Sequence, residues 1–201
     1  MKATVMKDSG ANLAASLRIA LATILLCGGL YPLVIFIFAR ITTPETASGS
    51  LLRNQAGKVV GSRLIAQAFT NPRYFRARPS AVKYDAAAAG GSNLSPAGPE
   101  VRKRALQTIA EFGADSLRPL PADLAAASGS GLDPFITLRA ALFQAPRVAQ
   151  ARGIALSDVE ASVRRHAAGQ QVFWSGEGLV NVLTLNMELD AAKINSIDPR
   201  P

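Results

Sequence analysis

The most constraining feature of this chain is an uncharged apolar run from Ile19 to Ala39, IALATILLCGGLYPLVIFIFA. Twelve of its 21 residues are Leu, Ile, Val or Phe. At about 1.5 Å per helical residue the run spans roughly 31 Å, which matches the hydrocarbon core of a bilayer. The sequence therefore predicts one transmembrane helix over residues 19–39.

A cleavable signal peptide is the main alternative to a permanent anchor. The apolar region of such a peptide has about 7 to 15 residues and ends at a small-residue cleavage site. This run is longer and stops at Arg40. We therefore expect an uncleaved, single-pass anchor in the plasma (inner) membrane.

The orientation of that anchor follows from the basic residues beside it. Three basic residues and one acidic residue precede the run: Lys2, Lys7, Arg18 and Asp8. After Arg40 no basic residue occurs before Arg53. Because positive charge marks the cytoplasmic side, we expect residues 1–18 to be cytoplasmic. Residues 40–50, which are polar and turn-forming, would then be a tether to an extracytoplasmic domain.

Residues 51–195 are expected to form that domain, with an α+β fold and a tail at residues 196–201. The pattern predicts a strand over 58–66 and a helix over 99–113, which opens at Pro99 and stops at Gly113. A helical segment over 138–153 contains Pro146, which should kink or divide it.

The C-terminal part of the domain carries one clear helix signal. Ser157 and Glu160 have the spacing of a capping box and predict a helix from Ser157 to about Ala168. Residues 178–185, GLVNVLTL, are typical of a strand, and a short helix is expected over residues 186–194.

Two small-residue segments occur in the domain: a first loop, residues 86–96 (AAAAGGSNLSP), and a second loop, residues 125–134 (AAASGSGLDP). Neither has the Lys of a Walker phosphate loop. Glycine-rich backbone can still form an anion nest, but tight turns are favoured.

Residues with catalytic chemistry are few. The only cysteine, Cys27, lies in the apolar run, and the only histidine is His166, so a zinc ligand set is not expected. The G-x-S-x-G pattern of elbow-type serine hydrolases is absent. We therefore expect no catalytic residue and no metal. A membrane-anchored hydrolase that uses Ser128, Ser130 or His166 is an alternative.

The chain is basic, with a formal net charge of +8, of which about +6 remains after the apolar run. Nucleic acid is not an expected partner, because the charges are dispersed and no recognition motif occurs. A cluster in PRYFRARPSAVK comprises Arg73, Arg76, Arg78 and Lys83. We interpret it as a solvated face or a partner-docking surface. An anchored module that binds anionic polymer or lipid through this cluster is a second alternative.

The order of motifs resembles the C subunit of the bacterial potassium-transporting Kdp P-type ATPase. The resemblance covers residues 19 to 190 and rests on these segments: YPLV inside the run, GSLL, GKVVGSRLI, AQAFTNPRYFRARPSA, AGGSNLSP, DLAAASGSGLDP, FQAPRVAQARG and VNVLTLNMELD. It implies an accessory subunit of a high-affinity potassium uptake pump. The partners would be a channel-like potassium-binding subunit, a P-type pump subunit and a small single-span subunit, with lipid around the anchor.

The resemblance also implies roles for particular residues. The family is described as a catalytic chaperone that raises the ATP affinity of the pump subunit, so ATP would be reached through the complex. This chain lacks DKTGT and is not the phosphorylated subunit. The nucleotide contacts carried over are Gly90, Gly91, Ser92 and Asn93. Partner-interface candidates are Gly28, Gly29 and Pro32, which permit close helix packing, together with Arg73 and Arg78.

Two points limit this carry-over. The charge pattern places the first loop outside the cytoplasm, where ATP is not found, so the domain could instead cap the potassium entrance or lock the helices of the complex. The family usually has His after the SGSGLDP segment, whereas this chain has Phe135. A polar role of that histidine is not expected here.

Overall fold

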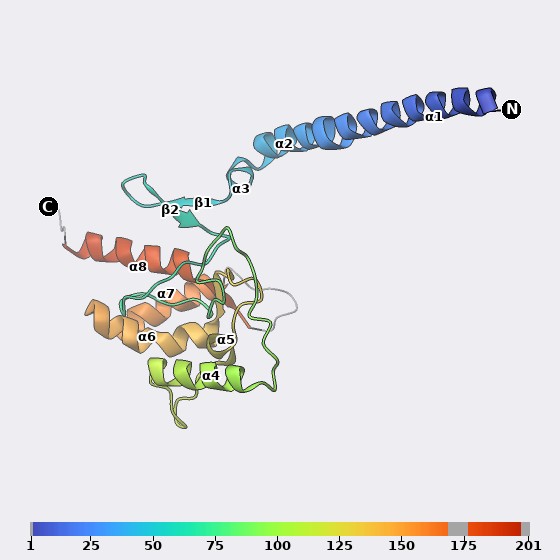
Figure 1. The fold of residues 1–201 in the computed structure, drawn as a ribbon. Helices are drawn as coiled ribbons and strands as arrows, with labels where there is room; N and C mark the ends of the chain where they lie inside the picture. Colours follow the sequence, from blue (N-terminus) through green and yellow to red (C-terminus); the bar gives the residue numbers. More distant parts are fainter. Residues whose placement is uncertain (1, 169–176, 198–201) are drawn as a thin grey trace. The chain divides into compact units, whose positions relative to one another are not determined.

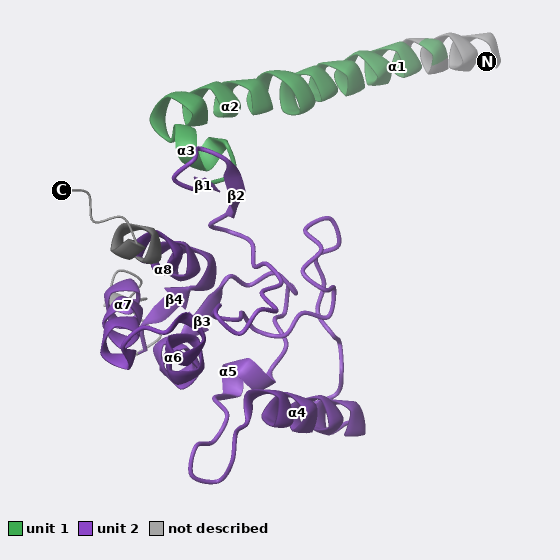
Figure 2. Ribbon diagram, turned by 90° about the vertical axis from the view of Figure 1, so that its left-hand side faces the viewer, with its two compact units in different colours: residues 1–50 green, residues 51–201 purple. Residues whose placement is uncertain are grey.

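The computed structural model describes residues 2–168 and 177–197. The chain divides into two compact units, residues 1–50 and residues 51–201, which are coloured separately in Figure 2. Each unit is described by itself.

The first unit is a long helix followed by a short one (Figure 1). The long helix comprises α1 (Lys2–Thr23), a π-helical segment η1 (Ile24–Leu30) and α2 (Tyr31–Thr42), and α3 (Pro44–Ala47) follows. Within the described residues one stretch, Asn12–Thr42, is long and apolar enough to cross a membrane, and none of it is buried. The apolar helix predicted over residues 19–39 is present and extends further at both ends, and part of the expected tether is helical.

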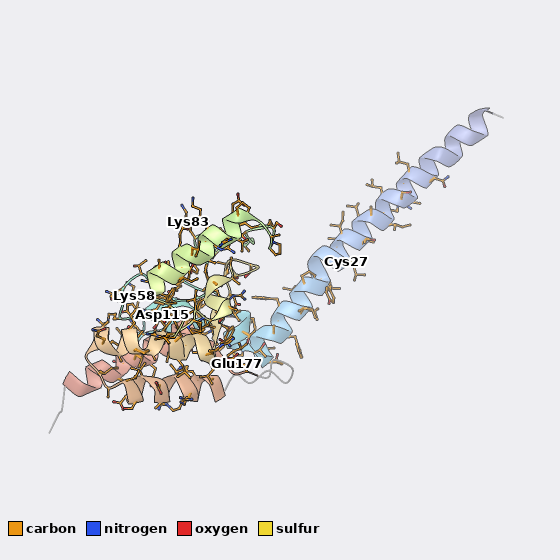
Figure 3. All side chains as sticks on the ribbon, turned by 90° about the horizontal axis from the view of Figure 1, so that it is seen from below. Cys27, Lys58, Lys83, Asp115 and Glu177 are labelled. Carbon is orange, nitrogen blue, oxygen red and sulfur yellow. The ribbon has the colours of Figure 1, made fainter. Side chains whose placement is uncertain are left out.

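The π-helical segment has a cause in the sequence. The Tyr31 amide donates to the Leu26 carbonyl, five residues back instead of four. Pro32 has no N–H, so the Gly28 carbonyl lacks its usual α-helical donor. A widened turn is one way in which a helix accommodates such a loss. Cys27, labelled in Figure 3, lies in this segment and is exposed.

The second unit has the predicted mixture of helices and strands. Its first part contains β1 (Leu51–Arg53), β2 (Val59–Ser62), α4 (Pro99–Phe112) and α5 (Ala122–Ala125). Its second part contains β3 (Phe135–Thr137), α6 (Leu138–Arg152), α7 (Leu156–Ala168), β4 (Leu179–Asn181) and α8 (Val182–Ile197). The strands form two antiparallel pairs, β1 with β2 and β3 with β4.

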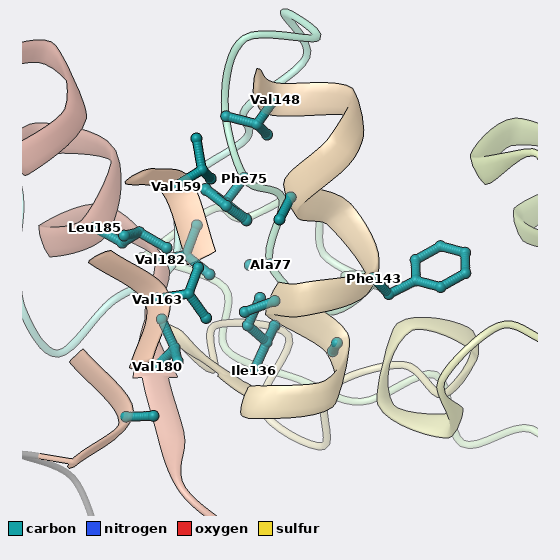
Figure 4. Close-up of a cluster of buried hydrophobic side chains, with 14 of the residues drawn as sticks. Phe75, Ala77, Ile136, Phe143, Val148, Val159, Val163, Val180, Val182 and Leu185 are labelled. Carbon is teal, nitrogen blue, oxygen red and sulfur yellow. The ribbon is translucent and has the colours of Figure 1, made fainter. Parts of the chain in front are cut away.

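The core lies where α6, α7 and α8 meet the β3–β4 pair. The three helices lie side by side in Figures 1 and 2, and Ile136 of β3 is opposite Val180 of β4. Figure 4 shows core valines from α6, α7, α8 and β4, with Phe75 inserted among them from an irregular segment. Fully buried members include Phe75, Ile136, Val148, Val159, Val163, Val180 and Leu185.

Residues 63–98 contain no helix or strand, yet their centre is buried. Side chains of α6 and α8 satisfy the backbone there. Asn186 accepts from the Phe75 amide at 2.8 Å and donates to the Phe75 carbonyl at 3.0 Å. Gln144 makes the same two bonds with Arg76, at 2.9 and 3.0 Å. These amide side chains take the place of a neighbouring strand.

Two details of the predicted helices differ from the structure. Helix α6 is not divided at Pro146, because core residues on both sides of the proline hold its turns together. Helix α7 begins at Leu156, so Ser157 lies inside its first turn and is not the cap.

The predicted strand over 178–185 is confirmed as β4 only over residues 179–181, and its second half, residues 182–185, is helix. Asn181 ends β4 and accepts from the Thr184 amide at 3.1 Å, which is the bond of a helix N-cap, and α8 begins at Val182. The strand-like residues after this cap are the buried face of α8. The helix predicted over 99–113 is confirmed as α4, with Gly113 in the left-handed conformation at its C-cap.

Candidate functional site: two paired loops

The first and second loops, which lie about 40 residues apart in the chain, contact each other. The Gly90 amide donates to the Ser130 carbonyl at 2.8 Å. A Cβ atom on Gly91 would lie only 2.8 Å from the Gly129 carbonyl oxygen. The glycines therefore permit a close approach of two backbones. The sequence singled out both loops but gave no indication that they pair.

Hydroxyl groups brace the second loop from inside. Ser128 is buried, and its Oγ accepts from the Asp133 amide at 3.2 Å. The Ser130 Oγ accepts from the Leu132 amide at 3.1 Å and lies 3.3 Å from the Ser128 Oγ. The Ser128 amide donates to the Pro79 carbonyl at 2.9 Å. These bonds fix the shape of the loop.

An ion pair between Arg78 and Asp133 supports the second loop from the side. Arg78 Nη1 lies 3.1 Å from Asp133 Oδ2, and Arg78 Nη2 donates to the Ala127 carbonyl at 3.2 Å. The Tyr84 hydroxyl donates to the Arg78 carbonyl at 2.9 Å. Burial raises the pKa of the Tyr84 phenol, so it stays a neutral donor. Arg78, a predicted partner contact, thus has internal partners.

Arg73, the other arginine predicted at an interface, also has an internal partner. Its Nη2 lies 3.8 Å from Asp190 Oδ1, and the same oxygen lies 2.9 Å from Nη1 of the buried Arg152. Arg152 also donates from Nε to the Arg73 carbonyl at 2.8 Å and lies over the Tyr74 ring. This carboxylate therefore helps to hold the irregular segment to α6 and α8.

The predicted nucleotide contacts fall into two groups. Gly90 and Gly91 form the contact with the second loop, so the Gly90 amide is already bonded and is not free for an anion. Ser92 is half-buried, whereas Asn93 is exposed with a φ of 49°. The surface that the first loop offers to another molecule is therefore at Ser92 and Asn93.

His166 lies elsewhere, on α7. Its Nδ1 is 3.0 Å from the Ser162 carbonyl and 3.4 Å from Glu188 Oε2 of α8. The contacts of Ser128 and Ser130 remain within the two loops and the residues beside them. The described part of the chain thus does not bring the serines and the histidine of the alternative hydrolase together.

The carboxyl of Glu188, beside His166, has a shifted pKa. Burial raises its pKa, but hydrogen bonds from Arg165 and Ser162 and the positive charges of His166 and Arg165 outweigh burial. The net result is a pKa below the usual value. The Arg165 bond, from Nη2 to Glu188 Oε1, measures 2.7 Å. This arrangement is typical of an ion pair that joins α7 to α8, not of a general base.

Two further features concern binding. Among the described residues no three His, Cys, Asp or Glu side chains gather where they could hold a metal ion. A groove of about 640 Å³ lies between the β1–β2 hairpin and α8, and its lining includes Arg53, Val60, Phe69, Tyr74, Leu183 and Met187. No sequence motif indicated this groove, because its walls come from segments more than 100 residues apart.

The predicted membrane contacts Gly28 and Gly29 lie in the π-helical segment, and Pro32 follows at the start of α2. No other atom lies within 4 Å of the Cβ position on either glycine. These positions therefore leave room for another helix to approach closely.

Comparisons with known proteins agree with the resemblance in the sequence. The family model "K+-transporting ATPase, c chain" matches residues 13–191. A potassium-transporting ATPase KdpC subunit of Parvibaculum lavamentivorans is 50% identical over 176 residues, which cover 88% of this chain and 94% of the relative. The subunit of the same name from Geobacter sulfurreducens is 42% identical over 170 residues, covering 83% and 90%. The chain therefore belongs to the family of the K+-transporting ATPase c chain.

Proposed function

We propose that this protein is a non-phosphorylated accessory subunit of an ATP-driven potassium uptake pump. The observation that carries the proposal is the extent of the family match, because residues 13–191 include both the apolar helix and the folded domain. The proposed partners are a channel-like potassium-binding subunit, a P-type pump subunit and a small single-span subunit. The chain would be anchored by one helix, with lipid around it.

The arrangement of polar side chains supports an accessory role over a catalytic one. Around the paired loops, the side chains of Gln144, Arg78 and Ser128 bond to backbone or to a carboxylate of the same domain. Such groups position a surface but have no free nucleophile or base. The domain would act by stabilising the complex and, as a catalytic chaperone, would raise the ATP affinity of the pump subunit.

Copurification tests the proposal directly. The tagged chain, extracted in mild detergent, should bring down a channel-like subunit and a P-type subunit. Gly28→Leu with Gly29→Leu should weaken this association, because the two side chains would fill the helix–helix contact. Ala20→Leu with Ala22→Leu adds nearly as much bulk to the same helix and is the matched control. Absence of both partners from the unmodified chain would contradict the proposal.

The side of the membrane is tested at the first loop. Because Cys27 is the only cysteine, a Cys27→Ser background leaves Ser92→Cys as the single thiol. The positive charges before the span predict that an impermeant thiol reagent labels this position from outside the cell. Labelling only after the cytoplasmic side is opened would reverse the orientation and favour Ser92 and Asn93 as nucleotide contacts.

A further inference from the structure

The basic residues of the domain are unevenly distributed along the chain. Residues 46–84 carry seven Lys or Arg residues and no Asp or Glu. Three of the seven belong to the β1–β2 hairpin and the residue after it: Arg53, Lys58 and Arg63. The other four form the Arg73–Lys83 cluster. Both groups are positively charged, but they differ in the carboxylates that lie near them.

In the second group the three arginines have carboxylate partners. Arg73 pairs with Asp190, Arg76 with Glu111, and Arg78 with Asp133. The charges of Arg76 and Arg78 are therefore compensated within the domain, and Arg73 shares the carboxylate of Asp190 with Arg152. This cluster is a poor candidate for an anionic partner, which the sequence left open as an alternative to a solvated face or a partner-docking surface.

The hairpin cations lack such compensation. Arg53, Lys58 and Arg63 are all exposed, and in the described part of the chain none of them pairs with a carboxylate. Arg53 Nη1 donates to the Gly57 carbonyl at 2.8 Å, a bond that keeps its positive charge beside the turn. Lys58, labelled in Figure 3, follows that turn.

Large apolar side chains are exposed beside these cations. The exposed fraction is 50% for Leu51, 39% for Val59 and 59% for Leu64. Arg53 and Val59 are opposite each other in the ladder, so a charged and an apolar side chain are neighbours on the hairpin. A surface with exposed cations and apolar groups suits the boundary between phospholipid headgroups and acyl chains.

The hairpin is also tied to the end of the candidate span. Helix α2 ends at Thr42 and β1 begins at Leu51. Nine residue steps reach at most about 32 Å even when fully extended, and α3 shortens this reach. The connection therefore limits how far the first residue of the hairpin can lie from the end of the candidate span, so the hairpin is within reach of the membrane surface there.

We propose that the β1–β2 hairpin is a membrane-surface contact that binds anionic phospholipid headgroups of the leaflet nearest the domain. Arg53, Lys58 and Arg63 provide the attraction, and Leu51, Val59 and Leu64 the shallow apolar contact. This contact restricts the motion of the domain on its tether. It requires that residues 12–42 cross the bilayer, which resistance to alkaline extraction tests separately.

The test uses the full chain, reconstituted in vesicles with and without phosphatidylglycerol in phosphatidylcholine. In the Cys27→Ser background a fluorophore on Gln55→Cys reports the position of the hairpin turn, and brominated acyl chains quench it when it reaches the membrane. Quenching should be stronger with phosphatidylglycerol and should fall at high salt, because exposed charges are screened. Each basic residue near an anionic surface adds a factor of about five to association.

The decisive variant replaces Arg53, Lys58 and Arg63 with Gln. It should lower the ratio of docked to free hairpin by about a hundredfold in phosphatidylglycerol vesicles. The matched control replaces three exposed cations elsewhere, Lys83, Arg102 and Lys103, with Gln and should leave quenching unchanged. Equal quenching in both lipid mixtures, or an equal loss in the two variants, would overturn the proposal. Loss of quenching when the partner subunits are added would also overturn it and assign the hairpin to a protein contact.

Discussion

Two regions of the folded domain, residues 63–98 and the described residues 135–168 and 177–197, satisfy their backbone hydrogen bonds in different ways. The second region consists mainly of α6, α7 and α8, whose amides and carbonyls pair within each helix. The first has no helix or strand, and its buried centre depends on amide and guanidinium side chains from the helices. Both regions contribute to one core, since Phe75 packs with valines of α6 to α8.

The difference shows where the domain is sensitive to substitution. A helix distributes its backbone bonds over many residues, so one changed side chain removes packing but few hydrogen bonds. In the irregular region one side chain satisfies both the donor and the acceptor of a buried residue. A polar side chain in the core of this domain is therefore as structural as an apolar one.

The largest effect is expected for Asn186→Leu. This change removes both bonds to Phe75 and leaves a buried amide and a buried carbonyl without partners. Each unsatisfied group costs about 1–3 kcal/mol, so the domain should lose about 2–6 kcal/mol of unfolding free energy. Urea unfolding of the full chain in detergent, followed by circular dichroism, measures this loss. The control Gln107→Leu, on the exposed side of α4, should change little.

A smaller loss is expected for Gly131→Ala in the second loop. Gly131 has a φ of 72°, and a Cβ there would lie 2.8 Å from the Gly90 carbonyl oxygen. The left-handed conformation costs about 1–2 kcal/mol and the crowding about 1–3 kcal/mol, so we expect a loss of about 2–5 kcal/mol. Gly129→Ala is the matched control, because its Cβ would meet nothing within 4 Å. Faster hydrogen exchange at the Gly90 amide should accompany only the first change.

Val163→Ala tests the helical region. Val163 is fully buried, and the change to alanine removes two methyl groups from the core. At about 0.8 kcal/mol for each group, plus a cavity term, the loss should be about 2 kcal/mol. Leu117→Ala removes more carbon from a side chain that is 94% exposed and should have almost no effect. If Val163→Ala destabilised the domain more than Asn186→Leu, the proposed contrast between the two regions would be wrong.

The sequence predicted the helical region better than the irregular one for a physical reason. The period of apolar residues and the flanking Pro99 and Gly113 are local signals, and α4 occurs where they indicate. The helix N-cap at Asn181 is also a local signal, but it lies within an apolar stretch rich in β-branched residues, which favour a strand. The strand was therefore predicted to continue through the first turn of α8.

The contacts that define the candidate site are not local. Gly90 bonds to Ser130, and Asn186 to Phe75, across separations that no periodicity reveals. The composition of the two loops favoured tight turns, but it did not indicate that the two backbones approach each other. The partner of each loop needed the three-dimensional fold. For the same reason the sequence could place Arg73 and Arg78 in one cluster but could not show their carboxylate partners.

The smallest predicted effect concerns acid pH and the ion pair between α7 and α8. The pKa of Glu188 is lowered in the folded chain, so its contribution to stability is present above the unfolded pKa of about 4.3. That contribution is lost as the pH falls through the folded pKa. Because the side chain is 37% exposed, solvent screening limits the effect to about 0.2–1 kcal/mol. Glu188→Gln should flatten this part of the pH profile of unfolding, whereas Glu100→Gln on α4 should not. An unchanged profile for Glu188→Gln would show that the pair does not join the two helices energetically.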